Sequence, residues 1–150
     1  MRNQRGFSII EIVIVLVVIA ILAGVSIPVY IGMKPVIRLS GATRQLMEDL
    51  MWARMQAINQ NNEFRIIYDN NHQYSILDDD NNNGAINAGE SLITKDIHNQ
   101  YDDVIYSSSN IDDLIFYPRG NAANLTTITL CNKSGTKAVS VAITGRVKKQ

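Results

Sequence analysis

The sequence has little cysteine, few histidines and no net charge. A single cysteine among 150 residues excludes an intrachain disulfide and a cysteine-rich metal site. The 14 basic residues balance the 14 acidic ones. This balance argues against a chain that binds nucleic acid over its whole surface, but it leaves room for a local basic patch. The residues that flank Cys131 predict a strand in which this cysteine is a small buried side chain.

Residues suited to catalysis are also scarce. His72 lies among asparagines and His98 lies in a polar segment. Neither has a serine or cysteine nearby that suits nucleophilic use. The sequence has no glycine-rich phosphate loop either. We therefore expect a protein that is not an enzyme.

What the sequence does have is one long apolar run close to its N-terminus. Between Phe7 and Met33, Glu11 is the only charged residue. As a helix, residues 7–31 would be about 37 Å long at ~1.5 Å per residue, more than the ~30 Å hydrocarbon core of a bilayer. Such a segment either spans a membrane or packs against copies of itself. Two arginines and no acid precede the run, which places the N-terminus in the cytoplasm and the rest of the chain across the membrane.

A secretory signal peptide is the competing interpretation of this run. The apolar region of a signal peptide is about 7–15 residues long, whereas apolar residues continue here through Ile31. A carboxylate in the hydrocarbon costs roughly 2.5–3.5 kcal/mol on insertion scales. A signal peptide has no use for such an acid, so Glu11 is a candidate functional residue that needs a cationic partner.

Residues 6–11, Gly-Phe-Ser-Ile-Ile-Glu, resemble the class III leader of type IV pilins and type II secretion pseudopilins. In that family a membrane enzyme, the prepilin peptidase, cuts after the glycine and methylates the new amino terminus. The resemblance implies a cut between Gly6 and Phe7. Glu11 of one subunit can then neutralise the Phe7 ammonium of its neighbour in a low-dielectric filament core. This pair would set the register of assembly.

The end of the apolar run is rich in residues that disturb a helix. Pro28 has the spacing from the cut that pilins commonly show, and Gly32 and Pro35 follow it. A proline removes one backbone hydrogen bond and permits a bend. We expect a kinked or locally loosened helix between about residues 28 and 40.

From residue 40 to residue 61 the sequence becomes amphipathic. One apolar stripe at helical spacing consists of Leu39, Leu46, Leu50, Ala53 and Ala57. A row of methionines, Met47, Met51 and Met55, runs beside the stripe and is interpreted as core. The pattern from Arg44 to Asn61 resembles the start of the GspH/FimT minor pseudopilin domain.

The sequence after Asn62 predicts strands. The candidates are residues 64–68, 74–77, 91–97, 104–106, 114–117, 125–131 and 138–143, in the last of which Val139, Val141 and Ile143 share one face. Residues 116–120 resemble the Phe-x-Pro-x-Gly signature late in the GspH/FimT domain. We expect an α+β fold, in which the C-terminal half of a long N-terminal helix lies on a small antiparallel β-sheet domain, as in type IV pilins. The expected segments are a leader (1–6), a transmembrane and assembly helix (7–33), an amphipathic helix (34–62) and a periplasmic β domain (63–150).

A polar loop over residues 79–90 has the spacing of an EF-hand-type calcium loop. Its candidate ligands are Asp79, Asn81, Asn83, the carbonyl of Ala85, and Glu90. Three features weaken the match: no predicted helix flanks the loop, two of the ligands are amides, and Asp-Asn-Gly clusters are common in turns. The alternative is a solvated hairpin loop, and any calcium affinity would be weak.

The C-terminus is basic and carries Arg146, Lys148 and Lys149. Arg146 and Lys148 alternate, so both would project from one face of an extended tail and could meet phosphates. The segment resembles the Gly-Arg-x-Arg tail with which FimT-type minor pilins bind DNA, although here lysine takes the last place. A few cations give only weak, salt-sensitive binding, and a solvated tail is the alternative.

These features together predict a minor pilin or pseudopilin of a type II secretion pseudopilus or a type IV pilus. It would wait in the inner membrane with its N-terminus cytoplasmic and its domain periplasmic, and then join a filament of other pilins. A DNA-binding minor pilin for natural transformation is one alternative. A membrane-anchored calcium-binding module that acts outside any filament is another.

Overall fold

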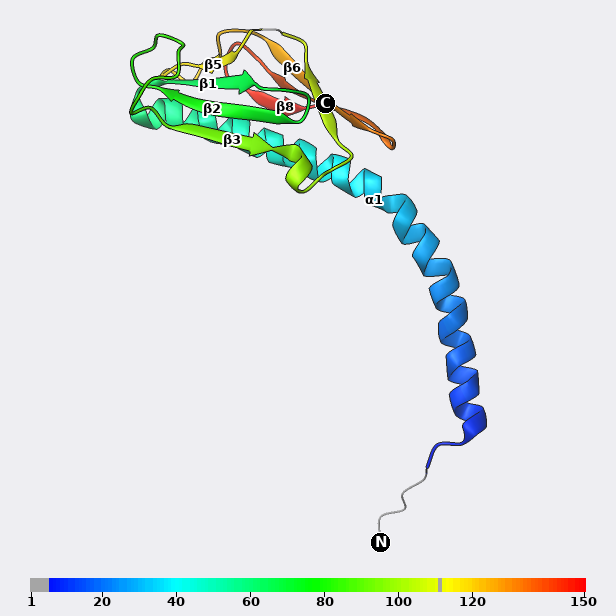
Figure 1. Ribbon diagram of the computed structural model, residues 1–150. Coiled ribbons are helices and arrows are strands. Elements are labelled where there is room, and N and C mark those ends of the chain that lie inside the picture. The colour runs from blue at the N-terminus through cyan, green and yellow to red at the C-terminus, as the bar shows by residue number, and fades with distance from the viewer. Residues whose placement is uncertain (1–5, 111) are drawn as a thin grey trace. The chain divides into compact units, whose positions relative to one another are not determined.

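The computed structural model describes residues 6–110 and 112–150 (Figure 1). Residues 1–5, most of the expected leader, lie outside this range. The chain divides into two compact units, Met1–Lys34 and Pro35–Gln150. Helix α1 (Ile9–Gln60) contributes to both. Helical conformation continues past Pro28 and Pro35, so the helix is not loosened between residues 28 and 40, and a kink there stays a prediction. Each proline removes a single backbone bond, and the neighbouring turns keep theirs.

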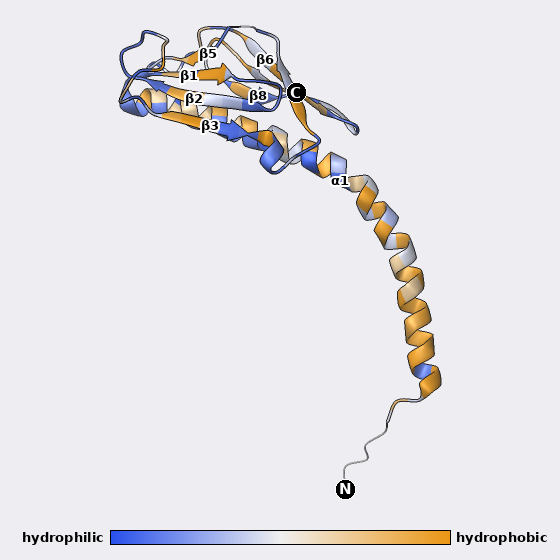
Figure 2. Cartoon of the chain, in the orientation of Figure 1, coloured by the Kyte–Doolittle hydropathy of each residue, from blue (hydrophilic) through white to orange (hydrophobic). Residues whose placement is uncertain are grey.

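The first unit consists of the apolar part of α1. Every described residue before Pro35 is exposed. The helix is long and apolar enough to cross a membrane, and its N-terminal part is coloured almost throughout as hydrophobic in Figure 2. Exposed apolar surface of this extent marks a segment whose surroundings are lipid or protein rather than water.

The second unit contains two antiparallel sheets. The first consists of β1 (Glu63–Tyr68), β2 (Gln73–Asp79), β3 (Leu92–Asp96) and β5 (Leu114–Phe116), in the order β3-β2-β1-β5. The second consists of β4 (Ile105–Ser108), β6 (Thr126–Asn132), β7 (Gly135–Val141) and β8 (Val147–Lys149), in the order β4-β6-β7-β8. A short 3-10 helix, η1 (Ile97–Asn99), follows β3. The C-terminal half of α1 lies along the sheets (Figure 1), and the expected α+β fold is confirmed.

The core of the second unit lies between α1 and the two sheets. All five residues of the predicted apolar stripe are buried, and Ala42 joins them. They form one cluster with side chains of both sheets, among them Ile66, Phe116 and Leu130. Each large side chain buried in this way contributes about 1.5–3 kcal/mol. The amphipathic half of α1 is therefore part of the domain and holds the two sheets together.

Four expected core positions are wrong. Met47 packs against the core, but Met51 and Met55 are 42% and 58% exposed. Met51 follows Leu50 by one position and Met55 follows Ala53 by two, so at about 100° per residue both lie off the buried stripe. Cys131 is only partly buried. Ile143 is exposed because β7 ends at Val141, so the alternation that buries Val139 and Val141 does not reach it.

Each of the seven expected strands has a counterpart, with ends displaced by up to three residues. Strand β8 was not expected. It pairs with β7 through the partners Val139 and Lys149, Ser140 and Lys148, and Val141 and Val147. Three residues with a single apolar side chain are too few to show the alternation that predicts a strand. The C-terminal segment is thus the edge of the second sheet and not a solvated tail.

Candidate functional site

The N-terminal end of α1 presents one acid in an apolar surface. Its first turn begins with Ser8, whose carbonyl accepts a hydrogen bond from the Glu11 backbone N–H at 3.1 Å. Glu11 lies among Phe7, Ile12, Val15 and Leu16, which line a small hollow with it. A carboxylate in the first turn also interacts favourably with the helix dipole. This surface can bind an apolar partner that brings a positive charge.

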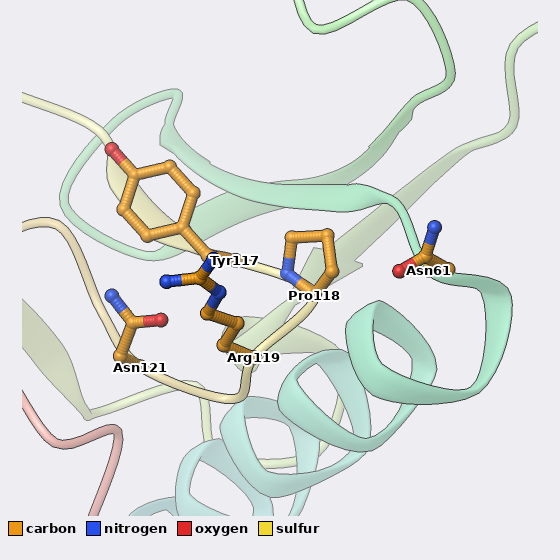
Figure 3. A pocket seen from close by; sticks show the side chains of 5 residues that line it. All are labelled: Asn61, Tyr117, Pro118, Arg119 and Asn121. Carbon is orange, nitrogen blue, oxygen red and sulfur yellow. The ribbon is translucent and has the colours of Figure 1, made fainter.

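A hollow in the second unit lies beside the Phe-x-Pro-x-Gly segment. Its lining residues are Asn61, Tyr117, Pro118, Arg119 and Asn121. In Figure 3 Tyr117, Arg119 and Asn121 lie on one side of the hollow, and Pro118 lies between them and Asn61. This set contains no carboxylate, thiol or imidazole. The hollow therefore has neither the general base nor the ligand set that catalysis or metal binding would need.

Two glycines that are far apart in the sequence are packed against each other here. Gly120 has φ +78° and Gly145 has φ +75°, a conformation that favours glycine. A Cβ added to Gly145 would lie 1.8 Å from the Gly120 carbonyl oxygen. Arg54 of α1 donates its Nε–H to the same oxygen at 2.8 Å. The Gly-Arg segment near the C-terminus therefore joins the last strand to α1 and to the turn after β5.

Sequence reasoning missed this contact because it is non-local. Each of the two segments resembles a family motif and contains a glycine, and that glycine is the available signal. What the sequence could not show is that both glycines are needed for the same close approach.

The buried carboxylate of the 79–90 loop already has a cation. Asp79 is fully buried and accepts hydrogen bonds from the backbone N–H groups of Asn83 and Gly84, at 3.0 and 2.8 Å. Arg65 Nε donates to its Oδ2 at 3.3 Å. The Arg65 guanidinium also lies within 3.1–3.3 Å of where a Cβ on Gly84 would be. A calcium ion at Asp79 would have to displace this guanidinium.

The other predicted ligands of the loop are hydrogen-bonded to each other. Asn81 Nδ2 donates to Glu90 Oε1 at 3.0 Å, and the Asn87 backbone N–H donates to Glu90 Oε2 at 2.8 Å. The Ala85 carbonyl accepts from Asn87 Nδ2 at 2.8 Å, and Asn83 Oδ1 accepts from the Ala85 N–H at the same distance. The loop thus brings the five predicted residues together but closes on itself, and calcium binding stays a prediction.

The basic residues at the C-terminus do not all share one face. Lys148 lies opposite Ser140 and Lys149 lies opposite Val139, so the two lysines point to opposite sides of the sheet. Both are exposed, as is Arg146. A further cation is close by: partial burial, and then the charge of Lys149, lowers the pKa of Lys137. DNA binding by this edge stays a prediction.

If the edge binds DNA, the Arg146→Ala, Lys148→Ala double variant should lose an electrophoretic shift that the unchanged chain shows at low salt. The expected cause is the loss of phosphate contacts, so the shift should also disappear as salt is raised. Replacing Arg44 and Lys133 by alanine removes two cations elsewhere and should leave the shift intact. A shift that survives in the Arg146, Lys148 double variant would rule out this site.

Comparison with known families decides what kind of chain this is. The sequence profile of the type II transport protein GspH matches residues 42–145. The chain belongs to the GspH family. A second profile, the prokaryotic N-terminal methylation motif, matches residues 1–27 of this GspH-family chain. No curated protein sequence matches it at a significant level.

Solved structures show the same fold as the GspH-family chain. The type IV minor pilin FimU of Pseudomonas aeruginosa is 20% identical, with a TM-score of 0.61 over 75% of this chain and 87% of that one. The minor pseudopilin EpsH of the Vibrio cholerae type 2 secretion system is 11% identical, with a TM-score of 0.58 over 75% of this chain and 96% of that one. The chain is a minor pilin or pseudopilin subunit, as the resemblance predicted.

Proposed function

We propose that this subunit is cut by a prepilin peptidase between Gly6 and Phe7 and methylated at the new amino terminus. The match of residues 1–27 to the methylation motif supports this proposal. Phe7 and Ser8 precede α1, which begins at Ile9, so the bond to be cut lies outside the helix. A peptidase needs an accessible bond outside regular secondary structure, and residues 6–8 are exposed and precede the helix.

The uncut subunit is anchored in the inner membrane by residues 7–33, with its N-terminus cytoplasmic and its second unit in the periplasm. Arg2 and Arg5 supply the charge asymmetry that favours this orientation. After the cut, the same apolar segment leaves the lipid and packs against the helices of other pilins in a filament.

The observation that carries the proposal is the exposure of the apolar segment. Every residue from Phe7 to Lys34 is exposed, and the second unit has a complete core without them. The segment therefore adds nothing to the core of its own domain and is left for lipid or for other subunits. Glu11 is its single acid between Phe7 and Met33. We assign to Glu11 the neutralisation of a neighbouring Phe7 ammonium, which sets the register between subunits in the filament. We assign to Pro28 an adjustment of the helix during assembly.

The test is co-expression of the chain with a prepilin peptidase, followed by mass spectrometry of the product. We expect a chain that lacks residues 1–6 and carries a methyl group on Phe7. Gly6→Val should block the cut because a branched side chain then occupies the position next to the scissile bond.

Gly24→Val is the matched control for this experiment. A Cβ at Gly6 or at Gly24 meets no atom within 4 Å, so neither change disturbs the fold. Gly24→Val should be cut like the unchanged chain. A product that keeps residues 1–6, or a Gly6→Val chain that is cut normally, would contradict the proposal.

A further inference from the structure

The chain has two histidines, and the fold brings them together. His72 lies in the turn between β1 and β2, and His98 lies in η1. Their rings stack, with centroids 4.1 Å apart and planes 7° from parallel. The backbone already joins the two segments, since the Ile97 N–H donates to the His72 carbonyl at 2.9 Å. The pairing is thus built into the end of the first sheet.

Asp96 completes the group as the N-cap of η1. Its Oδ1 accepts a hydrogen bond from the His98 backbone N–H at 2.8 Å and lies 3.0 Å from His72 Nδ1. One potential ligand atom from each of the three residues lies within 4.8 Å of the other two. All three residues are partly buried.

A second observation, beside the grouping of these three side chains, is a ring nitrogen that lacks a hydrogen-bond partner. Within the described part of the chain, His98 Nε2 is buried and has no hydrogen-bond partner. Buried polar atoms in folded proteins nearly always have a partner, so one that lacks it points to a missing ligand. Here the orphaned atom belongs to a residue whose two potential co-ligands are already beside it.

We propose that His72, Asp96 and His98 bind one Zn²⁺ ion. Imidazole and carboxylate are ligands that zinc prefers, and three protein ligands leave a fourth position for water. With bonds of about 2.0–2.1 Å, two ligands of a tetrahedral zinc lie about 3.3 Å apart. The His72 Nδ1 and Asp96 Oδ1 atoms, at 3.0 Å, are close to this spacing. Zinc takes the place of the proton that they share.

Zinc binding must break the ring stack. The lone pair of an imidazole nitrogen lies in the plane of its ring, so two parallel stacked rings cannot both direct a lone pair at one ion. One ring has to tilt, which brings its nitrogen the remaining distance to the ion. The loss of stacking is therefore a structural signature of the site. The site lies within the second unit and is independent of cleavage and assembly.

The test is calorimetric titration of the full, untagged chain in detergent with a zinc salt. A polyhistidine tag must be avoided because it adds imidazoles. We expect one ion per chain. His72→Gln and His98→Gln should each weaken binding at least about tenfold, because each removes a ligand. Asp96→Asn should weaken it similarly while keeping the cap, since asparagine caps a helix as well as aspartate does. Asp112→Asn, an exposed carboxylate elsewhere, should bind like the unchanged chain.

Two further readouts use the unchanged chain and do not depend on how the variants fold. The ring-proton NMR signals of the two histidines should shift on zinc addition as the stack opens. Affinity should also fall as the solution is made more acidic, because metal ligands must be deprotonated to bind an ion. Histidine signals that do not move, or His72→Gln and His98→Gln chains that bind like Asp112→Asn, would overturn the proposal.

Discussion

A chain with Glu11→Ala should still be cut after Gly6 but should fail to enter filaments. The substitution removes the one acid of the apolar segment, so membrane insertion is if anything easier and the peptidase still finds its substrate. If Glu11 neutralises a neighbouring Phe7 ammonium in the filament, as proposed, that ammonium then loses its partner. Leaving one charge of a buried pair alone costs about 3–5 kcal/mol, which is more than about a hundredfold in the association constant.

The measurement is the ratio of filament-bound to membrane-bound subunit in cells that make the whole machine, with cleavage followed by mass. Glu48→Gln is the matched control, because Glu48 is an exposed acid on the same helix but within the second unit. It should assemble normally. Normal assembly of Glu11→Ala would remove the register role, and loss of cleavage would show that Glu11 acts before assembly.

Gly145→Ala should destabilise the second unit by about 3–5 kcal/mol or prevent its folding. Positive φ costs a non-glycine residue about 1–3 kcal/mol, and forcing atoms into a packed contact costs about 1–3 kcal/mol more. The contact here is with backbone: the new Cβ would lie 1.8 Å from the Gly120 oxygen and 2.8 Å from Arg54 Nε. Neither the turn at Gly120 nor the hydrogen bond from Arg54 to its carbonyl can shift without a further loss of stability.

Urea unfolding of the full chain in detergent measures this change. Trp52, the single tryptophan, packs edge-on against Phe64 at 6.1 Å and reports on the core of the second unit. Gly89→Ala is the matched control for backbone strain. Gly89 also has a positive φ, at +102°, but an added Cβ there would have no atom within 4 Å, so this variant measures the cost of strain without a steric clash. It should cost about 1–2 kcal/mol. If both variants lost the same amount of stability, the proposed collision at Gly145 would be wrong.

The sequence predicted the helix and most of the sheets because their signals are local. The apolar stripe from Leu39 to Ala57 repeats at helical spacing over several turns, and all of its members are buried. The strands from 64–68 to 138–143 contain apolar side chains that alternate or stand between turn residues. β8 escaped prediction because it is short and basic and is defined by its pairing with β7, which the sequence of one segment does not show.

The candidate functional residues divide in the same way. Gly6, Phe7 and Glu11 could be proposed from the sequence because their spacing along one segment is itself the signal. The contact of Gly120 with Gly145 and the stack of His72 on His98 arise when distant turns are folded onto each other. For the loop at Asp79 the spacing of the polar residues predicted which side chains lie together, but it did not predict Arg65, whose guanidinium reaches the carboxylate from the adjacent strand.

The position of β8 at the rim of its sheet has a consequence for solubility. An edge strand offers unpaired backbone groups to any other extended chain, and lysine side chains along such an edge discourage that pairing. Lys148 and Lys149 point to opposite faces of this rim, so a second strand that approaches from either side meets a positive charge. Charges at this rim therefore disfavour pairing of the second sheet with the sheet of another copy of the chain, whereas the apolar helix carries no such protection.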